Sequence, residues 1–340
     1  MKGRQIVLDH LNTREAAALI VDGKLHDVLI DSDRPRVGTI YRAVADRPMK
    51  GQGGLFLSTP DGAAFLRQVK GIAPGDKLLV QVTGYAEEGK ALPVTTKLLF
   101  KSRYAIVTPE APGLNISRKI RDDDVRDTLL GIANEVMGDS EMGLIMRSSC
   151  EKAEPEDIAD DIAEMMDLAR AVLADREGEM DVLAEGDGPH GQAWREWIEP
   201  ADIDTAEGCF ETHGVLDLLD EAGDARVKLS GGGHMFVEPT RALVAVDVNT
   251  GGDTSPAAGM KANIAAAKDL PRQLRNRGLG GQITLDLAPM PKKDRRTFEI
   301  SLKAAFRGDS TETVMAGWTP LGNYELQRKR DRLPLNELLK

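Results

Sequence analysis

The chain has 340 residues, 41% of them hydrophobic and 29% charged, which is typical of a globular protein with two or three domains. Its formal net charge of −11 excludes a uniformly basic surface, so any nucleic-acid binding must use local basic patches. The only cysteines are Cys150 and Cys209, which excludes both a disulfide framework and a four-cysteine zinc site.

Short strands dominate the first hundred residues. Apolar runs at 5–9, 16–21 and 26–30 predict strands, and Asp22-Gly23 between the last two predicts a hairpin. Further short strands, separated by glycines, are predicted at 37–44, 54–58, 63–65, 77–84 and 91–99. Strands of this length and spacing predict a small antiparallel barrel with a hairpin loop at 84–90.

The middle of the chain mixes strands and helices. Strands are predicted at 104–108 and 142–147, and helices at 122–138 and 155–175. Residues 176–224 are rich in glycine and acidic side chains, which predicts an exposed loop that ends in a short helix at 214–222.

The pattern changes to strand–helix–strand after Ser230-Gly231-Gly232-Gly233. We interpret that glycine run as a flexible domain junction, because it lacks the lysine and the following helix of a P-loop. Strands are predicted at 234–237, 242–248 and 282–287, and helices at 257–277 and 295–306. Pro271 should kink the first helix or split it in two.

Two aspartates are the most informative residues. Asp247 lies late in the apolar run ALVAVDVN at 242–249, and Asp286 lies late in GGQITLD at 280–286. A carboxylate in a buried strand costs several kcal/mol unless a positive partner is present. Two such strands side by side would aim both carboxylates at one point, which suits Mg2+ and indicates phosphodiester hydrolysis. The alternative is a pair of strand-end caps or salt-bridged surface residues.

Asn249 lies two residues after Asp247, so on a strand the two side chains point to the same face. The alternative is an asparagine in a turn before Thr250-Gly251.

Four stretches resemble, in order, the catalytic region of the ribonuclease E/G family of endoribonucleases. They are NISRKI at 115–120, GLIMRS at 143–148, EPTRALVAVDVN at 238–249, and RQLR at 272–275 with LGGQITLD at 279–286. The resemblance implies an α+β multidomain chain. It comprises a ribonuclease-H-like fold in two parts (1–35 and 179–223), an inserted S1 (OB-type) β-barrel (36–100), a 5′-end sensor segment (101–178) and a DNase-I-like α/β catalytic domain (224–340).

The resemblance also implies the roles of the residues at the metal. Asp247 and Asp286 match the family's metal-binding aspartates, and Asn249 matches an asparagine that orients the attacking water or the phosphate. Mg2+, with Mn2+ as an alternative, would activate a water that attacks phosphorus and leaves 5′-phosphate and 3′-hydroxyl ends. No zinc is expected. The zinc-linked dimer of the best-known members is not expected either, because no cysteine pair follows the catalytic domain.

Further matches imply RNA contacts. Phe56 and Phe65 match aromatic residues that stack bases on the S1 surface, although two phenylalanines could equally fill the barrel core. Lys90 and Arg118 match basic residues of the RNA path, whereas a lone loop lysine is otherwise merely solvated.

A pocket for a 5′-monophosphate is implied as well. Arg147 and Ser148 match the family's arginine–threonine pair that holds this phosphate, and Ile106 would form an apolar wall of the same pocket. The alternative is an arginine that simply ends an edge strand.

Together these features predict an Mg2+-dependent endoribonuclease for single-stranded RNA in RNA processing or decay, with a preference for 5′-monophosphorylated substrates. The alternatives are a catalytically weak or inactive RNA-binding protein of the same fold, and a partner scaffold that uses the acidic segment 151–224. No signal peptide and no apolar stretch of membrane length is visible, so we expect a cytoplasmic protein without a membrane partner. The oligomeric state and the RNA target stay open.

Overall fold

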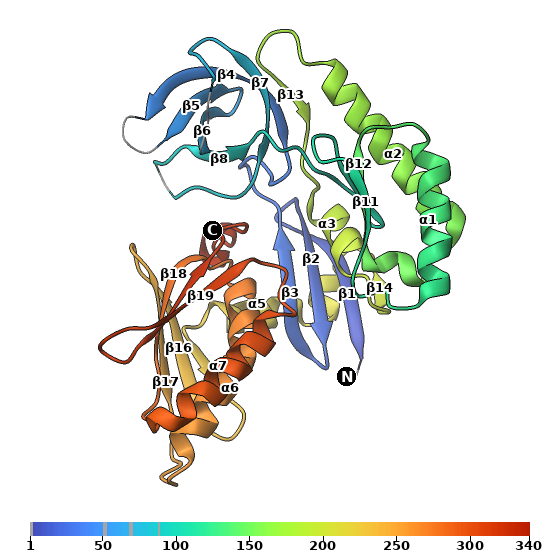
Figure 1. Ribbon diagram of the computed structural model, residues 1–340. Coiled ribbons are helices and arrows are strands. Elements are labelled where there is room, and N and C mark those ends of the chain that lie inside the picture. The colour runs from blue at the N-terminus through green and yellow to red at the C-terminus, as the bar shows by residue number, and fades with distance from the viewer. Residues whose placement is uncertain (1–2, 50–52, 68–70, 88) are drawn as a thin grey trace. The chain divides into compact units, whose positions relative to one another are not determined.

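The computed structural model describes residues 3–49, 53–67, 71–87 and 89–340 (Figure 1). The chain forms two compact units. One unit consists of two separated segments, Met1–Asp31 and Ala201–Lys340, and we call it the two-segment unit. The other, Ser32–Pro200, is inserted between those segments, and we call it the inserted unit.

A small sheet in the two-segment unit joins its two segments. The strand order is β14 (Asp202–Asp204), β1 (Arg4–Leu11), β2 (Arg14–Val21) and β3 (Lys24–Ile30). β14 pairs in parallel with β1, and the hairpin predicted between β2 and β3 is confirmed. The short helices α4 (Cys209–Thr212) and α5 (Val215–Gly223) pack their apolar side chains into the core of this sheet.

The same unit holds a larger mixed sheet. Its strands, in spatial order, are β15 (Arg226–Lys228), β16 (His234–Pro239), β17 (Val244–Asn249), β18 (Gly281–Asp286), β20 (Tyr324–Arg328) and β19 (Thr313–Trp318). β17 and β18 are parallel, and the other neighbouring pairs are antiparallel. The helices are α6 (Ala258–Asn276), η2 (Lys292–Asp294), α7 (Arg295–Phe306) and α8 (Leu335–Leu338).

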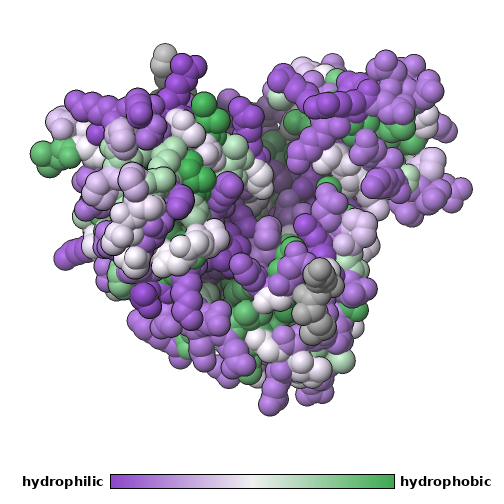
Figure 2. All heavy atoms as spheres, turned by 90° about the horizontal axis from the view of Figure 1, so that it is seen from below, coloured by the Kyte–Doolittle hydropathy of each residue, from purple (hydrophilic) through white to green (hydrophobic). Residues whose placement is uncertain are grey.

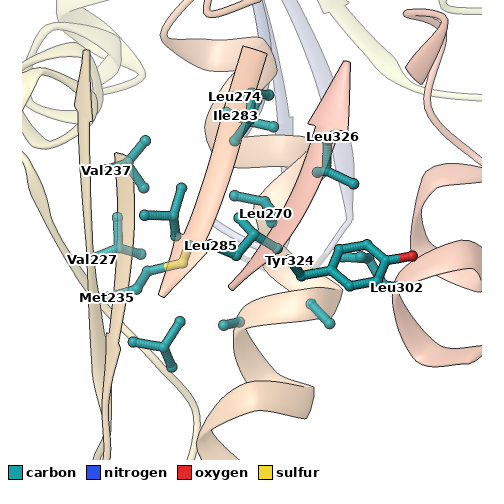
Figure 3. Close-up of a cluster of buried hydrophobic side chains, with 14 of the residues drawn as sticks. Val227, Met235, Val237, Leu270, Leu274, Ile283, Leu285, Leu302, Tyr324 and Leu326 are labelled. Carbon is teal, nitrogen blue, oxygen red and sulfur yellow. The ribbon is translucent and has the colours of Figure 1, made fainter. Parts of the chain in front are cut away.

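Helices α6 and α7 cover one face of this sheet. Figure 3 shows Met235, Val237, Ile283 and Leu285 projecting from the strands into the same cluster as Leu270 of α6. Side chains alternate along each strand, so the residues between these point to the opposite face, which we call the open face. The core is therefore built on one side, and the other side is free to carry polar groups.

Of the two effects predicted for Pro271, a kink or a split of the long helix, the split is wrong. Pro271 lies inside α6, yet α6 runs unbroken from Ala258 to Asn276. Proline removes one helical hydrogen bond and costs about 3 kcal/mol. Pro271 is buried, and the helix is not split at this position.

The inserted unit contains a closed barrel. The strands β4 (Ile40–Met49), β5 (Gly54–Thr59), β6 (Gly62–Arg67), β8 (Leu92–Thr95) and β7 (Lys77–Val82) pair in that order. β7 also pairs with β4, which closes the barrel and confirms the prediction. One detail differs, because β6 and β8 are parallel rather than antiparallel.

The rest of the inserted unit packs two helices on a second small sheet. The strand order is β11 (Gly113–Ile116), β12 (Gly143–Met146), β10 (Ala105–Thr108) and β9 (Phe100–Lys101). The two α-helices are α1 (Asp123–Met137) and α2 (Pro155–Ala174), and η1 (Ser148–Lys152) is a short 3-10 helix between them. The carboxylate of Asp122 caps α1 by accepting from the backbone N–H groups of Asp124 and Val125.

The segment predicted as a loop is more ordered than expected. It contains β13 (Asp181–Ala184), which pairs with β4, and α3 (Pro189–Glu196), in addition to β14 and α4. These elements are three to eight residues long, too short to show a period in the sequence.

Hydrophilic residues predominate on the molecular face drawn in Figure 2. Among the helices of the described residues, none combines the length and the apolarity needed to cross a membrane.

Candidate functional site

Asp247 and Asp286 lie side by side in the larger sheet. β17 and β18 pair in parallel, and Asp247 is the direct partner of Asp286 in this register. Neighbouring strands are about 4.8 Å apart, so both carboxylates start from one short stretch of the sheet. The structure therefore brings the two aspartates together, as the sequence predicts.

The prediction that these two carboxylates are buried is wrong. Both aspartates are exposed on the open face, while Val246 and Val248 beside Asp247 are buried. The sequence runs are apolar because one face packs on the helices, and the other face meets water. What calls for a cation is thus the closeness of two negative charges, which repel each other, rather than the cost of burying them.

The side chain of Asn249 contacts the Asp247 carboxylate. Its side-chain Nδ2 donates to Oδ2 of Asp247 at 2.9 Å, so the two side chains share the open face as predicted. This bond fixes the orientation of one carboxylate oxygen.

Ser230 and the glycines at 231–233 are not a domain junction. They form the turn between β15 and β16, where Gly231 and Gly232 have φ angles of 90° and 88° that favour glycine. A Cβ added to Gly233 would lie 2.8 Å from the backbone oxygen of Asn249. The turn thus packs directly against the backbone that carries Asn249.

The chemistry of these donors suits a hard cation. Mg2+ in proteins is commonly held by one or two carboxylates and keeps several waters. Within the described ranges, no group of three or more His, Cys, Asp or Glu side chains is arranged to hold a metal. Two exposed carboxylates with one amide fit Mg2+, whereas structural zinc takes four ligands that are mostly sulfur or nitrogen.

The two aromatic residues predicted on the barrel form a pair. Phe56 on β5 is the register partner of Phe65 on β6, and the ring centroids are 5.2 Å apart. Both are half-buried and lie outside the barrel core, which Leu55, Leu57 and their neighbours fill. The alternative in which both rings fill the core is therefore wrong. Arg47 adds a cation 5.5 Å from the Phe56 ring centroid.

The two predicted basic residues are both exposed. Lys90 lies in the loop between β7 and β8 and forms an ion pair with Glu87. Arg118 follows β11 at the surface of the same unit. Neither position distinguishes an RNA contact from a solvated side chain.

The Arg147 guanidinium already forms an ion pair with the carboxylate of Glu196. Its Nη1 donates to the backbone oxygen of Ser102 at 2.6 Å, and its Nη2 forms a 2.6 Å ion pair with Oε2 of Glu196. Burial alone would raise the pKa of the Glu196 carboxyl, but the charges of Arg147 and Arg195 outweigh it and hold that pKa below its usual range. A phosphate would have to replace Glu196 on this arginine.

The other two predicted pocket residues are near Arg147 in register or in sequence. Ile106 on β10 is the register partner of Ile145 on β12, two residues before Arg147, which follows β12 with an extended backbone. Ser148 directly follows Arg147 and begins η1. Sequence reasoning missed Glu196, because it lies in α3, a helix that the sequence did not reveal.

Known proteins of one family are similar to this chain. The model of the Ribonuclease E/G family matches residues 100–200 and 198–331. Ribonuclease G of Salmonella typhimurium (strain SL1344) is 27% identical over an alignment of 390 positions, which covers 95% of this chain and 79% of that protein. Ribonuclease G of Haemophilus influenzae is 26% identical over an alignment of 387 positions, which covers 95% of this chain and 78% of that protein. Ribonuclease E of Nostoc sp. is 24% identical over an alignment of 393 positions, which covers 98% of this chain but only 57% of that protein.

Proposed function

The chain belongs to the ribonuclease E/G family of endoribonucleases, and we propose that it hydrolyses single-stranded RNA with Mg2+, or Mn2+ in its place, at Asp247 and Asp286. The observation that carries the proposal is the register of β17 and β18, which sets the two carboxylates opposite each other on an exposed face. We further propose a role in RNA processing or decay.

Asp247, Asp286 and Asn249 would have different roles in this reaction. The two carboxylates would hold the cation, and Asn249 keeps the Asp247 carboxylate in place through its 2.9 Å hydrogen bond. When bound, the metal supplies positive charge for the scissile phosphate and lowers the pKa of a water. Hydrolysis would add a water to phosphorus and break the bond to the 3′ oxygen, which would leave a 3′-hydroxyl and a 5′-phosphate.

The family's domain plan is proposed on the same basis. The pairing of β14 with β1 supports a ribonuclease-H-like fold made of 1–35 and 179–223, and the closed barrel supports an S1 domain at 36–100. Residues 101–178 would then form the 5′-end sensor, and 224–340 the DNase-I-like catalytic domain.

Cleavage of a short single-stranded RNA tests the proposal. The RNA carries a 5′-monophosphate and a 3′-fluorescein, and it is incubated with Mg2+ or with EDTA. We expect internal cleavage that EDTA abolishes, and downstream fragments whose 5′ ends become labelled by polynucleotide kinase only after phosphatase treatment. Fragments with 2′,3′-cyclic phosphate ends, or cleavage in EDTA, would refute metal-assisted hydrolysis. Binding without cleavage at every Mg2+ concentration would favour the inactive RNA-binding alternative.

The proposed 5′-phosphate pocket gives a first prediction. Replacing Arg147 with glutamine should remove the preference for 5′-monophosphorylated over 5′-hydroxylated RNA, while cleavage of the 5′-hydroxylated RNA continues. Glu196→Gln should strengthen the preference, because it removes the carboxylate that competes with phosphate for Arg147. The measurement is the ratio of kcat/KM for the two RNAs. Arg170→Gln, at an exposed pair on α2, is the matched control. A ratio that is unchanged in Arg147→Gln would contradict the pocket.

The glycine turn gives a second prediction. Gly233→Ala should lower the cleavage rate about tenfold, because its Cβ would push the Asn249 backbone by several tenths of an ångström. Gly252→Ala is the control, since a Cβ there would meet no described atom within 4 Å. Equal single-turnover rates for the two variants would show that Asn249 tolerates this displacement.

A further inference from the structure

An aromatic pair lies beside the two aspartates on the open face. On β16, Phe236 is the register partner of Asp247, and His234 is the partner of Asn249. The rings of Phe236 and His234 meet edge to face, with centroids 5.5 Å apart. Phe236 thus lies one strand away from Asp247, a distance of about 5 Å between backbones.

The burial of the intervening residues fixes the direction of this pair. Met235 and Val237 are 0% and 1% exposed and point into the core (Figure 3). Their neighbours His234 and Phe236 therefore project from the open face, and both are only half-buried. These rings do not belong to the core cluster of the sheet.

Two basic residues extend this surface to the next strand. On β15, Arg226 is the partner of Phe236, and Lys228 is the partner of His234. Both are exposed, whereas Val227 between them is buried in the core (Figure 3). Across the sheet, one row therefore reads Arg226, Phe236, Asp247 and Asp286. We call Arg226, Lys228, His234 and Phe236 the β15–β16 platform.

We propose that this platform binds the single-stranded RNA next to the cleaved bond. One base would stack on Phe236 and His234, and the backbone phosphates beyond it would lie against Arg226 and Lys228. Bases stack on aromatic side chains regardless of sequence, and a basic edge guides the phosphates. The proposal rests on the proposed function, because it takes the aspartate pair as the point of cleavage.

Charge favours this path over the other direction on the same face. Glu238 and Glu325 lie in the row that contains Ala245 and Thr284, two residues before the aspartates. Their negative charges repel a polyphosphate strand, whereas the β15 edge attracts it. In a chain with a net charge of −11, Arg226 and Lys228 supply positive charge on the strand next to the aromatic pair.

Base stacking is tested with Phe236→Ala, Phe236→Leu and Phe236→Tyr. Binding is measured by fluorescence anisotropy in Asp247→Asn protein, and cleavage in the Asp247 protein under single-turnover conditions. We expect the Phe236→Ala and Phe236→Leu variants to lose roughly 5- to 150-fold in affinity, and the Phe236→Tyr variant to recover it. An RNA with one abasic nucleotide beside the cleavage site should bind equally to proteins with and without the Phe236→Ala substitution. Val314→Ala, exposed at the far edge of the sheet, is the control.

The phosphate contacts are tested by salt dependence. The Arg226→Gln and Lys228→Gln double variant should flatten the plot of log affinity against log salt by about 0.7 per lost contact. Arg241→Gln, exposed in the turn at the other end of β16, should leave the slope unchanged.

The outcomes separate the two proposals. If Asp247→Asn blocks cleavage but the Phe236 and Arg226 variants bind and cleave as the parent does, the platform is refuted and the proposed function stands. If the platform variants lose binding while the parent protein never cleaves, the proposed function fails and the platform is retained as an RNA-binding surface.

Discussion

Replacing Asp247 with asparagine is expected to abolish RNA cleavage while RNA binding and folding stay intact. The change removes one of two charges that face each other across β17 and β18, and asparagine keeps the shape of the side chain. Because Asp247 is exposed, the loss of its charge costs the fold little. Loss of a metal ligand should lower the rate at least about 1,000-fold, or ~4 kcal/mol of transition-state stabilisation.

Single-turnover cleavage at saturating RNA and Mg2+ measures this loss. Asp217→Asn, on the exposed side of α5, is the control for removing a carboxylate from the same unit. Partial recovery at higher Mg2+ would show that the variant mainly weakens metal binding. Cleavage at the parent rate by the double variant Asp247→Asn, Asp286→Asn would disprove the metal assignment.

The second large effect concerns stability. Asp309→Asn should lower the free energy of unfolding of the two-segment unit by about 3–5 kcal/mol. The Asp309 carboxylate is fully buried and bridges Arg275 of α6, at 2.5 Å, and Arg328 of β20. These arginine side chains are only 7% and 2% exposed. Without the aspartate, two guanidinium charges would stay in the interior with much less compensation.

Urea unfolding followed by tryptophan fluorescence measures this change. Trp318 lies on β19 of the two-segment unit, so replacing Trp194 and Trp197 of the inserted unit with phenylalanine limits the signal to the relevant part. Asp217→Asn removes an exposed carboxylate from the same two-segment unit and should cost less than about 1 kcal/mol. A similar small loss in Asp309→Asn would mean that water or other groups replace the missing charge.

The sequence predicts most of the strands and the adjacency of the two aspartates, because each strand around them is strongly apolar and of ordinary length. It does not tell which face the aspartates occupy. An apolar run such as ALVAV at 242–246 fits a strand that is buried on both sides, because Leu243 and Ala245 on the side of Asp247 are apolar too and hide the alternation. The open face becomes visible only when α6 and α7 are seen to cover one side.

Other features of the site depend on contacts that are distant in sequence. Glu196 meets Arg147 from a helix of eight residues with little apolar character, so no periodic signal marks it. Ser230 and the glycines at 231–233 look like a linker, because a hairpin turn is recognised by its flanking strands and β15 is only three residues long. The 5′-end preference, the cytoplasmic location and the metal stay predictions.

Because one unit is inserted into the other, the two segments of the two-segment unit are synthesised at different times. The first 31 residues supply three strands whose apolar sides are covered by Phe210, Val215 and Leu219, and whose β1 edge is covered by β14. Translation at about 5–20 residues per second delays these partners by roughly 10–30 s while residues 32–200 emerge. The inserted unit holds its own cores and can fold in that interval. The hairpins made first therefore wait, with open edges, for the strand and helices made much later, and this is the period in which the nascent chain most needs protection from aggregation.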